Sequence, residues 1–217
     1  MFYLSSQKKT YMLILIVAAT SFEVEPLVNS FGNKLDVLIT GAGMVPTAFA
    51  LGRQFNMHKY DLVINLGIAG SFDRSITPGY VVEITEDTFA ETGAEDDQEF
   101  IPITTLGFGE NTFKPTTTLE QVCNSLYLAK AKAITVNTVH GNEESIQKIQ
   151  RRLNPQIETM EGAAFFYACR QFNTPCLQIR SVSNYVEKRN RDNWDIQLAI
   201  KNLNNFAIEL VNRIINN

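Results

Sequence analysis

Two carboxylates and one amide stand at points where a predicted strand meets a helix or ends. Glu23 follows the apolar run 12–19, Glu161 opens a helical segment rich in alanine and aromatic residues, and Asn184 closes the block Arg180-Ser181-Val182-Ser183-Asn184. One carboxylate can accept hydrogen bonds from vicinal hydroxyls, and another can take a proton from water. Each residue also has a purely structural interpretation: a charge that favours a helix N-terminus for Glu161, a solvated helix start for Glu23 and an ordinary strand exit for Asn184.

Two glycine-bearing segments follow other apolar runs. Gly41-Ala42-Gly43 comes after the run 36–40, and Gly67-Ile68-Ala69-Gly70 comes after the run 61–66. We predict a tight turn at each, and we expect Gly43, Ala69 and Gly70 to line one ligand pocket, because the carboxyl ends of parallel strands share an edge of the sheet. Pro46 stands where a dinucleotide fingerprint would have its third glycine, so a dinucleotide is disfavoured.

The elements that must position these residues alternate along the chain. Continuous apolar runs predict strands over 12–19, 36–40, 61–66, 80–85, 131–136 and 177–182. Helical periodicity covers 45–55, 143–153, 161–172 and 193–215. The repeated order of strand and helix predicts an α/β fold with a mixed, mostly parallel, twisted sheet flanked by helices. The stretch 93–118 is irregular and is expected to be a surface excursion.

The composition excludes several classes of protein. The chain has 217 residues, a net charge of −4, 45% hydrophobic and 19% charged residues, which is an ordinary globular balance. It has no basic run, so nothing favours a nucleic-acid partner. Three scattered cysteines and two histidines form neither a disulfide framework nor a zinc pattern, so we expect no metal and a reducing compartment.

The N-terminal segment has two interpretations. Residues 11–19 are strongly apolar and follow Lys8 and Lys9, as in a signal peptide. The run is shorter than the ~20 residues that span a bilayer, and no cleavage pattern follows it. We therefore expect a buried strand, no contact with a membrane, a polar leader over residues 1–10 and one domain over 11–217.

In their order along the chain, these motifs resemble the purine nucleoside phosphorylase and nucleosidase superfamily. The order is Glu23, Gly-Ala-Gly, Asn-Leu-Gly-Ile-Ala-Gly, Pro-Gly-Tyr-Val-Val, Thr-Met-Glu-Gly-Ala-Ala and Arg-Ser-Val-Ser-Asn. The resemblance covers about residues 12–215 and is greatest to the hydrolase branch, which holds 5′-methylthioadenosine/S-adenosylhomocysteine nucleosidases and futalosine hydrolases. It implies a single-domain phosphorylase/hydrolase-like fold, a homo-oligomer, and no metal or organic cofactor.

The resemblance also implies roles for individual residues. Glu161 would bind the ribose hydroxyls, with Met160 packed on the sugar, and would stabilise the positive charge of an oxocarbenium-like transition state. Glu23 would position and deprotonate the attacking water, and Glu25 is its rival for this role. His140 lies near the place where relatives have an aromatic residue stacked on the base; the alternative is a histidine in a surface loop.

The second glycine segment favours water over phosphate as the nucleophile. Phosphorylases of the superfamily carry an arginine just before this segment, where this chain has Asn65, and Ile68 would put an apolar side chain where phosphate would lie. No arginine or lysine lies in the first glycine segment. A dianion without a basic partner is poorly held, so a hydrolase is expected and a phosphorylase is the third alternative.

Asn184 favours hypoxanthine over adenine as the leaving base. The methylthioadenosine nucleosidases end this strand in an aspartate that protonates N7, whereas an amide can donate to a 6-oxo group and accept from N7–H. Ser183 precedes it, and the basic stretch 188–191 and Trp194 that follow resemble futalosine hydrolases. Arg189 is a candidate to bind the carboxylate on the 5′ side of futalosine; a solvated loop, with Trp194 as a packing anchor, is the alternative.

The expected activity is that of an N-glycosidase which hydrolyses futalosine to hypoxanthine and dehypoxanthine futalosine. The resemblance implies a cytoplasmic step of menaquinone biosynthesis. Release of adenine by a methylthioadenosine/S-adenosylhomocysteine nucleosidase is the runner-up, and a non-catalytic nucleoside-binding protein is the rival of a different class. Retention of both Glu23 and Glu161 argues against the binding protein, which has little use for a water-activating carboxylate.

Overall fold

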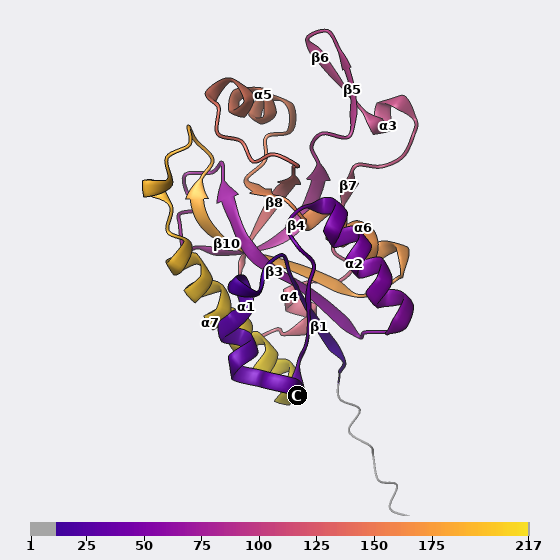
Figure 1. The fold of residues 1–217 in the computed structure, drawn as a ribbon, viewed down its shortest axis with the longest axis vertical. Coiled ribbons are helices and arrows are strands. Elements are labelled where there is room, and N and C mark those ends of the chain that lie inside the picture. Colours follow the sequence, from indigo (N-terminus) through magenta and orange to yellow (C-terminus); the bar gives the residue numbers. More distant parts are fainter. Residues whose placement is uncertain (1–11, 217) are drawn as a thin grey trace, which may run out of the picture.

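A computed structural model describes residues 12–216 as a sheet between two layers of helices (Figure 1). The expected leader over residues 1–10 lies outside the described residues. The strands are β1 Ile14–Ala18, β2 Asp36–Ile39, β3 Leu62–Ser71, β4 Val81–Phe89, β5 Gly93–Asp96, β6 Glu99–Pro102, β7 Thr112–Phe113, β8 Ala129–Thr135, β9 Ile157–Thr159 and β10 Cys176–Tyr185. The α-helices are α1 Ser21–Phe31, α2 Met44–Met57, α3 Ile103–Leu106, α4 Leu119–Val122, α5 Glu143–Leu153, α6 Gly162–Gln171 and α7 Ile196–Asn216.

Five strands of the main sheet close into a ring. β3 pairs with β10, β10 with β4, β4 with β8, β8 with β9, and β9 with β3 again. β1 extends the sheet from β3, β2 pairs with β1, and the short β7 pairs with β4. The pairings β10–β4, β3–β9 and β4–β7 are antiparallel and the others are parallel, which confirms the predicted mixed, mostly parallel sheet.

The two helical layers cover opposite faces of this sheet. Figure 1 shows α1 beside α7 on one side and α2 beside α6 on the other. β1 illustrates why the predicted strands are apolar throughout: Leu15 and Val17 join the core under α2 and α6, while Ile16 joins the core under α1 and α7. Burying side chains of this size stabilises the fold by about 1.5–3 kcal/mol each. Within residues 12–216, no helix has the length and apolar character needed to cross a membrane.

The second glycine segment is not the predicted turn. β3 continues through residues 67–70 to Ser71 and stays paired with β10. A Cβ atom at Gly67 would lie 2.0 Å from Arg180 Nη1, and one at Gly70 would lie 2.8 Å from Val186 Cγ2. Gly67 and Gly70 are therefore needed because the side chains of Arg180 and Val186 approach the backbone of β3 closely, and they do not form a tight turn. The first segment does turn, with Gly43 at φ 99° directly before α2.

Helix α1 was missing from the predicted elements. Thr20 and Glu23 form a capping box at its N-terminus, a signal that the sequence contains. Pro26 lies inside the helix and argues against one. The structure resolves the conflict through Asn204 of α7, whose amide accepts from Leu27 N at 3.0 Å and donates to Glu23 O at 2.9 Å. Asn204 thus bridges the backbone groups that an uninterrupted helix would join directly, and it ties the Glu23 turn to α7.

The irregular stretch 93–118 is partly ordered into secondary structure. It forms the β5–β6 hairpin, α3 and β7, and the hairpin projects from the body of the molecule in Figure 1, as a surface excursion was expected to do. The predicted helix over 193–215 begins at Ile196 instead. Residues 191–193 form a short 3-10 helix, and Asp195 Oδ1 accepts from Leu198 N at 3.0 Å in the first turn of α7.

Candidate active site

Glu23 turns its carboxylate back toward the sheet. Its Oε2 accepts from Thr20 N at 2.9 Å and from Thr20 Oγ1 at 3.0 Å, and its Oε1 accepts from Ile68 N of β3 at 3.1 Å. The side chain is 7% exposed, so the interpretation as a solvated helix start is wrong. The rival Glu25 is exposed on α1. The geometry therefore favours Glu23 as the carboxylate that faces a ligand at the end of β3.

Glu161 joins the Met-Glu motif to the first glycine turn. It is the N-cap residue of α6, it is buried, and its Oε1 accepts from Gly43 N at 2.9 Å. Met160 lies half-buried beside it. Within residues 12–216, Oε2 of Glu161 accepts no hydrogen bond, so this oxygen is available to a ligand hydroxyl. The structure thus brings Gly43 to Glu161, and Met160 directly precedes this carboxylate in the chain.

Asn184 has its amide oriented by its neighbours on β10. Its Oδ1 lies 2.8 Å from the hydroxyl of Ser183, which donates to it, and its Nδ2 donates to Tyr185 O at 2.9 Å. The Ser183 hydroxyl also lies 3.2 Å from Ala69 O, and Asn184 pairs with Gly70 across the two strands. Since an amide nitrogen has two hydrogens, one N–H of Asn184 remains for a ligand. The structure thus places Ala69, Gly70, Ser183 and Asn184 next to one another.

His140 is held in place by a buried carboxylate. Its Nδ1 bonds Glu158 Oε2, and its backbone N–H donates to Glu158 Oε1 at 3.0 Å. The ring also packs edge-on against Phe72, with centroids 6.2 Å apart. Glu158 pairs with Gly70 across β9 and β3, so His140 borders the group around Asn184. A fixed ring beside that group does not fit the alternative of a free histidine in a surface loop.

The segment after β10, which carries Arg189, forms three backbone hydrogen bonds with β3, β10 and the loop that carries His140. Val186 N donates to Ser71 O at 2.8 Å, Arg189 N to Gly141 O at 3.2 Å, and Asp195 N to Ser183 O at 2.8 Å. The Arg189 guanidinium lies 5.1 Å from the centre of the Trp194 ring, and that of Arg191 lies 5.9 Å from it. Arg189 is exposed, and its backbone lies next to the loop that carries His140.

Arg180 lies beside the site, although the sequence analysis named it only as the first residue of the block that ends in Asn184 and gave it no role. It is 1% exposed, and its Nη2 donates to Asn65 and to Gln178 Oε1, the latter at 2.9 Å. Its Nη1 lies against Gly67, where a Cβ atom would also be 3.0 Å from Glu23 Oε1. The expectation that no basic group approaches the second glycine segment is therefore wrong, because it counted only residues nearby in sequence. An arginine inside an apolar strand is the signal that could have found it, since arginine is rarely fully buried.

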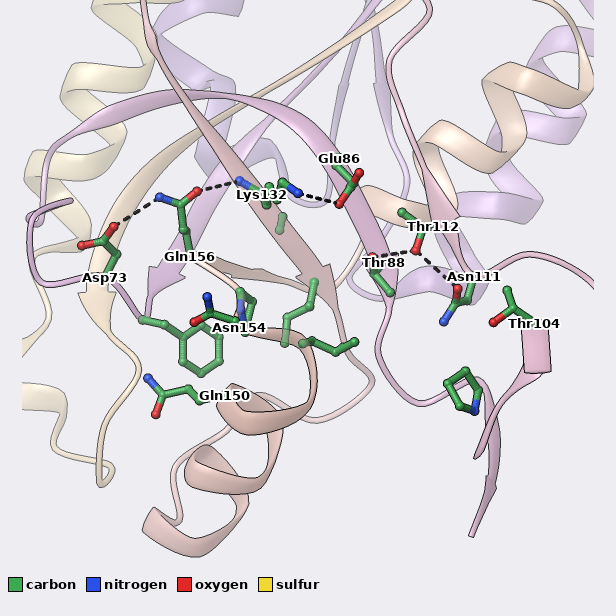
Figure 2. A pocket seen from close by; sticks show the side chains of 16 residues that line it. Asp73, Glu86, Thr88, Thr104, Asn111, Thr112, Lys132, Gln150, Asn154 and Gln156 are labelled. Atoms are coloured by element: carbon green, nitrogen blue, oxygen red, sulfur yellow. Dashed lines mark hydrogen bonds and ion pairs between the residues drawn. The ribbon is translucent and has the colours of Figure 1, made fainter. Parts of the chain in front are cut away.

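A polar cavity of about 790 Å³ lies elsewhere, between β4, β8 and the C-terminal end of α5 (Figure 2). Its groups already bind one another: Lys132 Nζ lies 3.3 Å from Glu86 Oε1, and Gln156 bonds both Asp73 Oδ2 and Lys132 N. Its lining contains none of the predicted site residues. We therefore place the candidate site at the edge formed by β3, β10 and the start of α6.

These features define a class of protein: an α/β protein with a closed mixed sheet, two buried carboxylates at one edge, and an amide and a histidine beside them. The model of the phosphorylase superfamily matches residues 27–216, and the chain belongs to this superfamily.

Curated relatives and a solved structure agree with this assignment. The chain is 34% identical over 143 residues to a futalosine hydrolase of Streptomyces coelicolor, in an alignment that covers 65% of this chain and 61% of the relative. It is 24% identical to a 5′-methylthioadenosine/S-adenosylhomocysteine nucleosidase of Bacillus subtilis, over 84% of this chain and 83% of that one. The structure of futalosine hydrolase of Helicobacter pylori strain 26695 superimposes with a TM-score of 0.78 at 16% identity, covering 92% and 97% of the two chains. At that identity, the structural likeness concerns the fold.

Proposed function

We propose that this protein is an N-glycosidase that hydrolyses futalosine to hypoxanthine and dehypoxanthine futalosine. The observation that carries the substrate assignment is the amide of Asn184, whose carbonyl is engaged by Ser183 and whose remaining N–H is left for the base. The higher identity to a futalosine hydrolase, 34%, than to a methylthioadenosine nucleosidase, 24%, supports the same choice.

The sugar end of the reaction rests on the two carboxylates. Glu161 accepts hydrogen bonds from the ribose hydroxyls, and its charge stabilises the positive charge that builds on the ring. Water held by Glu23 attacks C1′ and gives its proton to this carboxylate. The bond between C1′ and the purine nitrogen breaks, its electron pair leaves with the base, and hypoxanthine takes a proton from solvent. Met160 packs on the sugar.

Water is the nucleophile because Glu23 already accepts the hydrogen bond of the backbone N–H group of β3 that could otherwise bind an anion. The Ile68 N–H, which phosphate would need, donates to Glu23 Oε1. Glu23 Oε1 and Arg180 Nη1 both lie next to the position that a Cβ atom of Gly67 would take, so a phosphate dianion there would meet the negative charge of Glu23 at close range. A water molecule meets no such repulsion and finds an acceptor in Glu23.

The base and the far end of the substrate are bound by the groups after β3 and β10. Asn184 donates its free N–H to O6 of hypoxanthine, and a 6-oxo group also accepts part of the leaving-group charge. The fixed ring of His140 stacks on the purine. Arg189 binds the carboxylate on the 5′ side of futalosine, since a guanidinium pairs well with a carboxylate.

The proposal includes a homo-oligomer in the cytoplasm, acting in menaquinone biosynthesis. Val45 and Phe49 on α2 are 73% and 70% exposed, and they follow Gly43, so a second copy that covers them would border the ribose site. Cys123, Cys169 and Cys176 are free thiols, which fits a reducing compartment.

The test is release of hypoxanthine from futalosine by the purified protein in phosphate-free buffer, with the sugar product identified by mass spectrometry. Release that requires phosphate would identify a phosphorylase. Release of adenine from methylthioadenosine would support the second candidate, the activity named for the Bacillus subtilis relative. Binding of hypoxanthine without turnover would identify a nucleoside-binding protein.

A further inference from the structure

Asp87 is a fully buried carboxylate of β4 that takes no part in the proposed hydrolysis. The hydroxyl of Thr135 on β8 donates to its Oδ1 at 2.8 Å, and Gln178 Nε2 on β10 donates to its Oδ2 at 3.0 Å. Thr159 Oγ1 on β9 lies 3.4 Å from Oδ2. Among residues 12–216, no basic side chain forms an ion pair with Asp87. A buried charge held only by neutral donors costs stability, and such groups gather where function requires them.

One arm of this hydrogen-bonded network ends at the helix that Glu161 begins. The hydroxyls of Thr135 and Thr159 accept from the backbone N–H groups of the second and first residues of α6, at 2.7 and 3.2 Å. These amides have no partner within the helix. An ionised Asp87 can only accept hydrogen bonds, so the hydroxyls of Thr135 and Thr159 point their protons toward it. The lone pairs of the two hydroxyl oxygens are then free to accept from the N–H groups at the start of α6. A Cβ at Gly162 would lie 2.0 Å from Asp87 Oδ2, so glycine lets the carboxylate reach the helix start.

The other arm ends at Arg180. Gln178 Oε1 accepts from Arg180 Nη2 at 2.9 Å while its Nε2 donates to Asp87. Arginine only donates and a carboxylate only accepts, so no other orientation of the Gln178 amide satisfies both neighbours. Asp87 therefore determines where one of the two acceptors of Arg180 Nη2 lies, Asn65 being the other, and Arg180 in turn lies against Gly67 beside Glu23.

The network draws on every strand of the closed ring. In the order β3, β4, β8, β9 and β10, the contributing side chains are Asn65, Asp87, Thr135, Thr159, and Gln178 with Arg180. It thus connects the water side of the site with the ribose side through the interior of the sheet.

We propose that Asp87 is a positioning residue that fixes the ribose carboxylate Glu161 and the guanidinium of Arg180 relative to each other. This inference rests on the proposed function of the site. Asp87 acts through Thr135 and Thr159 on the start of α6 and through Gln178 on Arg180, and it touches no substrate.

The test compares three variants with the wild type in the hydrolysis of futalosine. Asp87→Asn puts a donor against Gln178 Nε2, and kcat/KM should fall by about 10²-fold, as for a misplacement of about 1 Å. Asp87→Asn/Gln178→Glu restores a donor–acceptor pair at both ends, because the carboxylate introduced on β10 accepts both from the amide introduced on β4 and from Arg180. The double variant should recover at least about tenfold of the loss. Glu83→Gln is the matched control: this carboxylate is also buried on β4 but accepts from Leu119 N at 2.8 Å, away from the network.

Hydrogen exchange gives a readout that needs no substrate. In Asp87→Asn, the amides of the first two residues of α6 should exchange faster by about tenfold or more, while those of α7 keep their rates. A kcat/KM within about threefold of wild type in Asp87→Asn would overturn the proposal, as would a double variant no better than the single one. Unchanged exchange at the start of α6 would also overturn it. If the wild type cleaves no nucleoside, the proposed function fails, and the exchange result still decides the role of Asp87.

Discussion

Glu161 accepts a hydrogen bond from the backbone N–H of Gly43 at 2.9 Å, across 118 positions of sequence. This contact joins the start of α6 to the turn before α2, and it leaves the second oxygen of Glu161 for a ligand. The proposed ribose site thus lies between two segments that the chain brings together only on folding.

Glu161→Gln keeps an acceptor for Gly43 but removes the negative charge. Because that charge stabilises the developing positive charge on the ribose, kcat/KM for futalosine should fall by about 10²-fold or more. Steady-state kinetics measures this, and circular dichroism controls for folding. A variant with nearly full activity would show that Glu161 only caps the helix.

Glu23→Gln removes the proposed base and leaves its neighbour Glu25 intact. Turnover should fall by about 10³-fold while the affinity for hypoxanthine, measured by calorimetry, stays close to that of the wild type. Glu25→Gln is the matched control, since this side chain is exposed on the same helix and should be dispensable. If Glu25→Gln were the inactive variant, the two assignments would have to be exchanged.

Asn184→Asp tests how the protein selects its base. A carboxylate would set an acceptor against O6 of hypoxanthine, so kcat/KM for futalosine should fall by about 10²-fold, while release of adenine from methylthioadenosine should rise. Asn184→Ala should lower kcat/KM for futalosine without raising the release of adenine from methylthioadenosine. Equal effects of both variants on the two substrates would argue against contact between Asn184 and the base.

Arg189→Gln should raise the KM for futalosine by about tenfold, the loss expected for one charge-assisted hydrogen bond. Inosine lacks the carboxylate, so its kinetics should not change. Lys188→Gln is the control, because this exposed neighbour has no assigned role. A parallel loss with inosine would mean that Arg189 supports the loop and does not bind the substrate.

Asp87 gives the stability a defined dependence on pH. Burial raises the pKa of this carboxyl to about 6 from 3.8, although hydrogen bonds from Gln178 and Thr135 and the charge of Arg180 lower it. Between these values the folded protein holds a proton that the unfolded chain has lost. The contribution of Asp87 to the free energy of unfolding is therefore fully present below about pH 4. It falls by on the order of 3 kcal/mol as the pH rises through about 6. Urea denaturation between about pH 4 and about pH 7 measures the free energy of unfolding of the wild type and of Asp87→Asn. The wild type should lose stability relative to the variant as the pH rises, and a difference between the two that stays constant with pH would contradict the prediction.

The sequence predicted the sheet, the main helices and the residues that gather at its edge, because these follow from apolar periodicity and from motifs. It missed α1, since Pro26 argues against a helix and only Asn204, distant in sequence, supplies the missing partner. It placed a turn at residues 67–70 because glycine usually marks one, whereas here the glycine admits Arg180. It did not single out Asp87, because donors for a buried carboxylate that come from three other strands leave no local pattern.

The proposed reaction is hydrolysis of a 6-oxopurine nucleoside that carries a carboxylate on its 5′ side. The most direct measurement compares kcat/KM for futalosine, inosine and methylthioadenosine, offered separately to the purified protein without phosphate. We expect hypoxanthine from futalosine, much slower cleavage of inosine, and no adenine from methylthioadenosine. Preferred release of adenine would contradict the role given to Asn184, and no release from any of the three would contradict the assignment as a hydrolase.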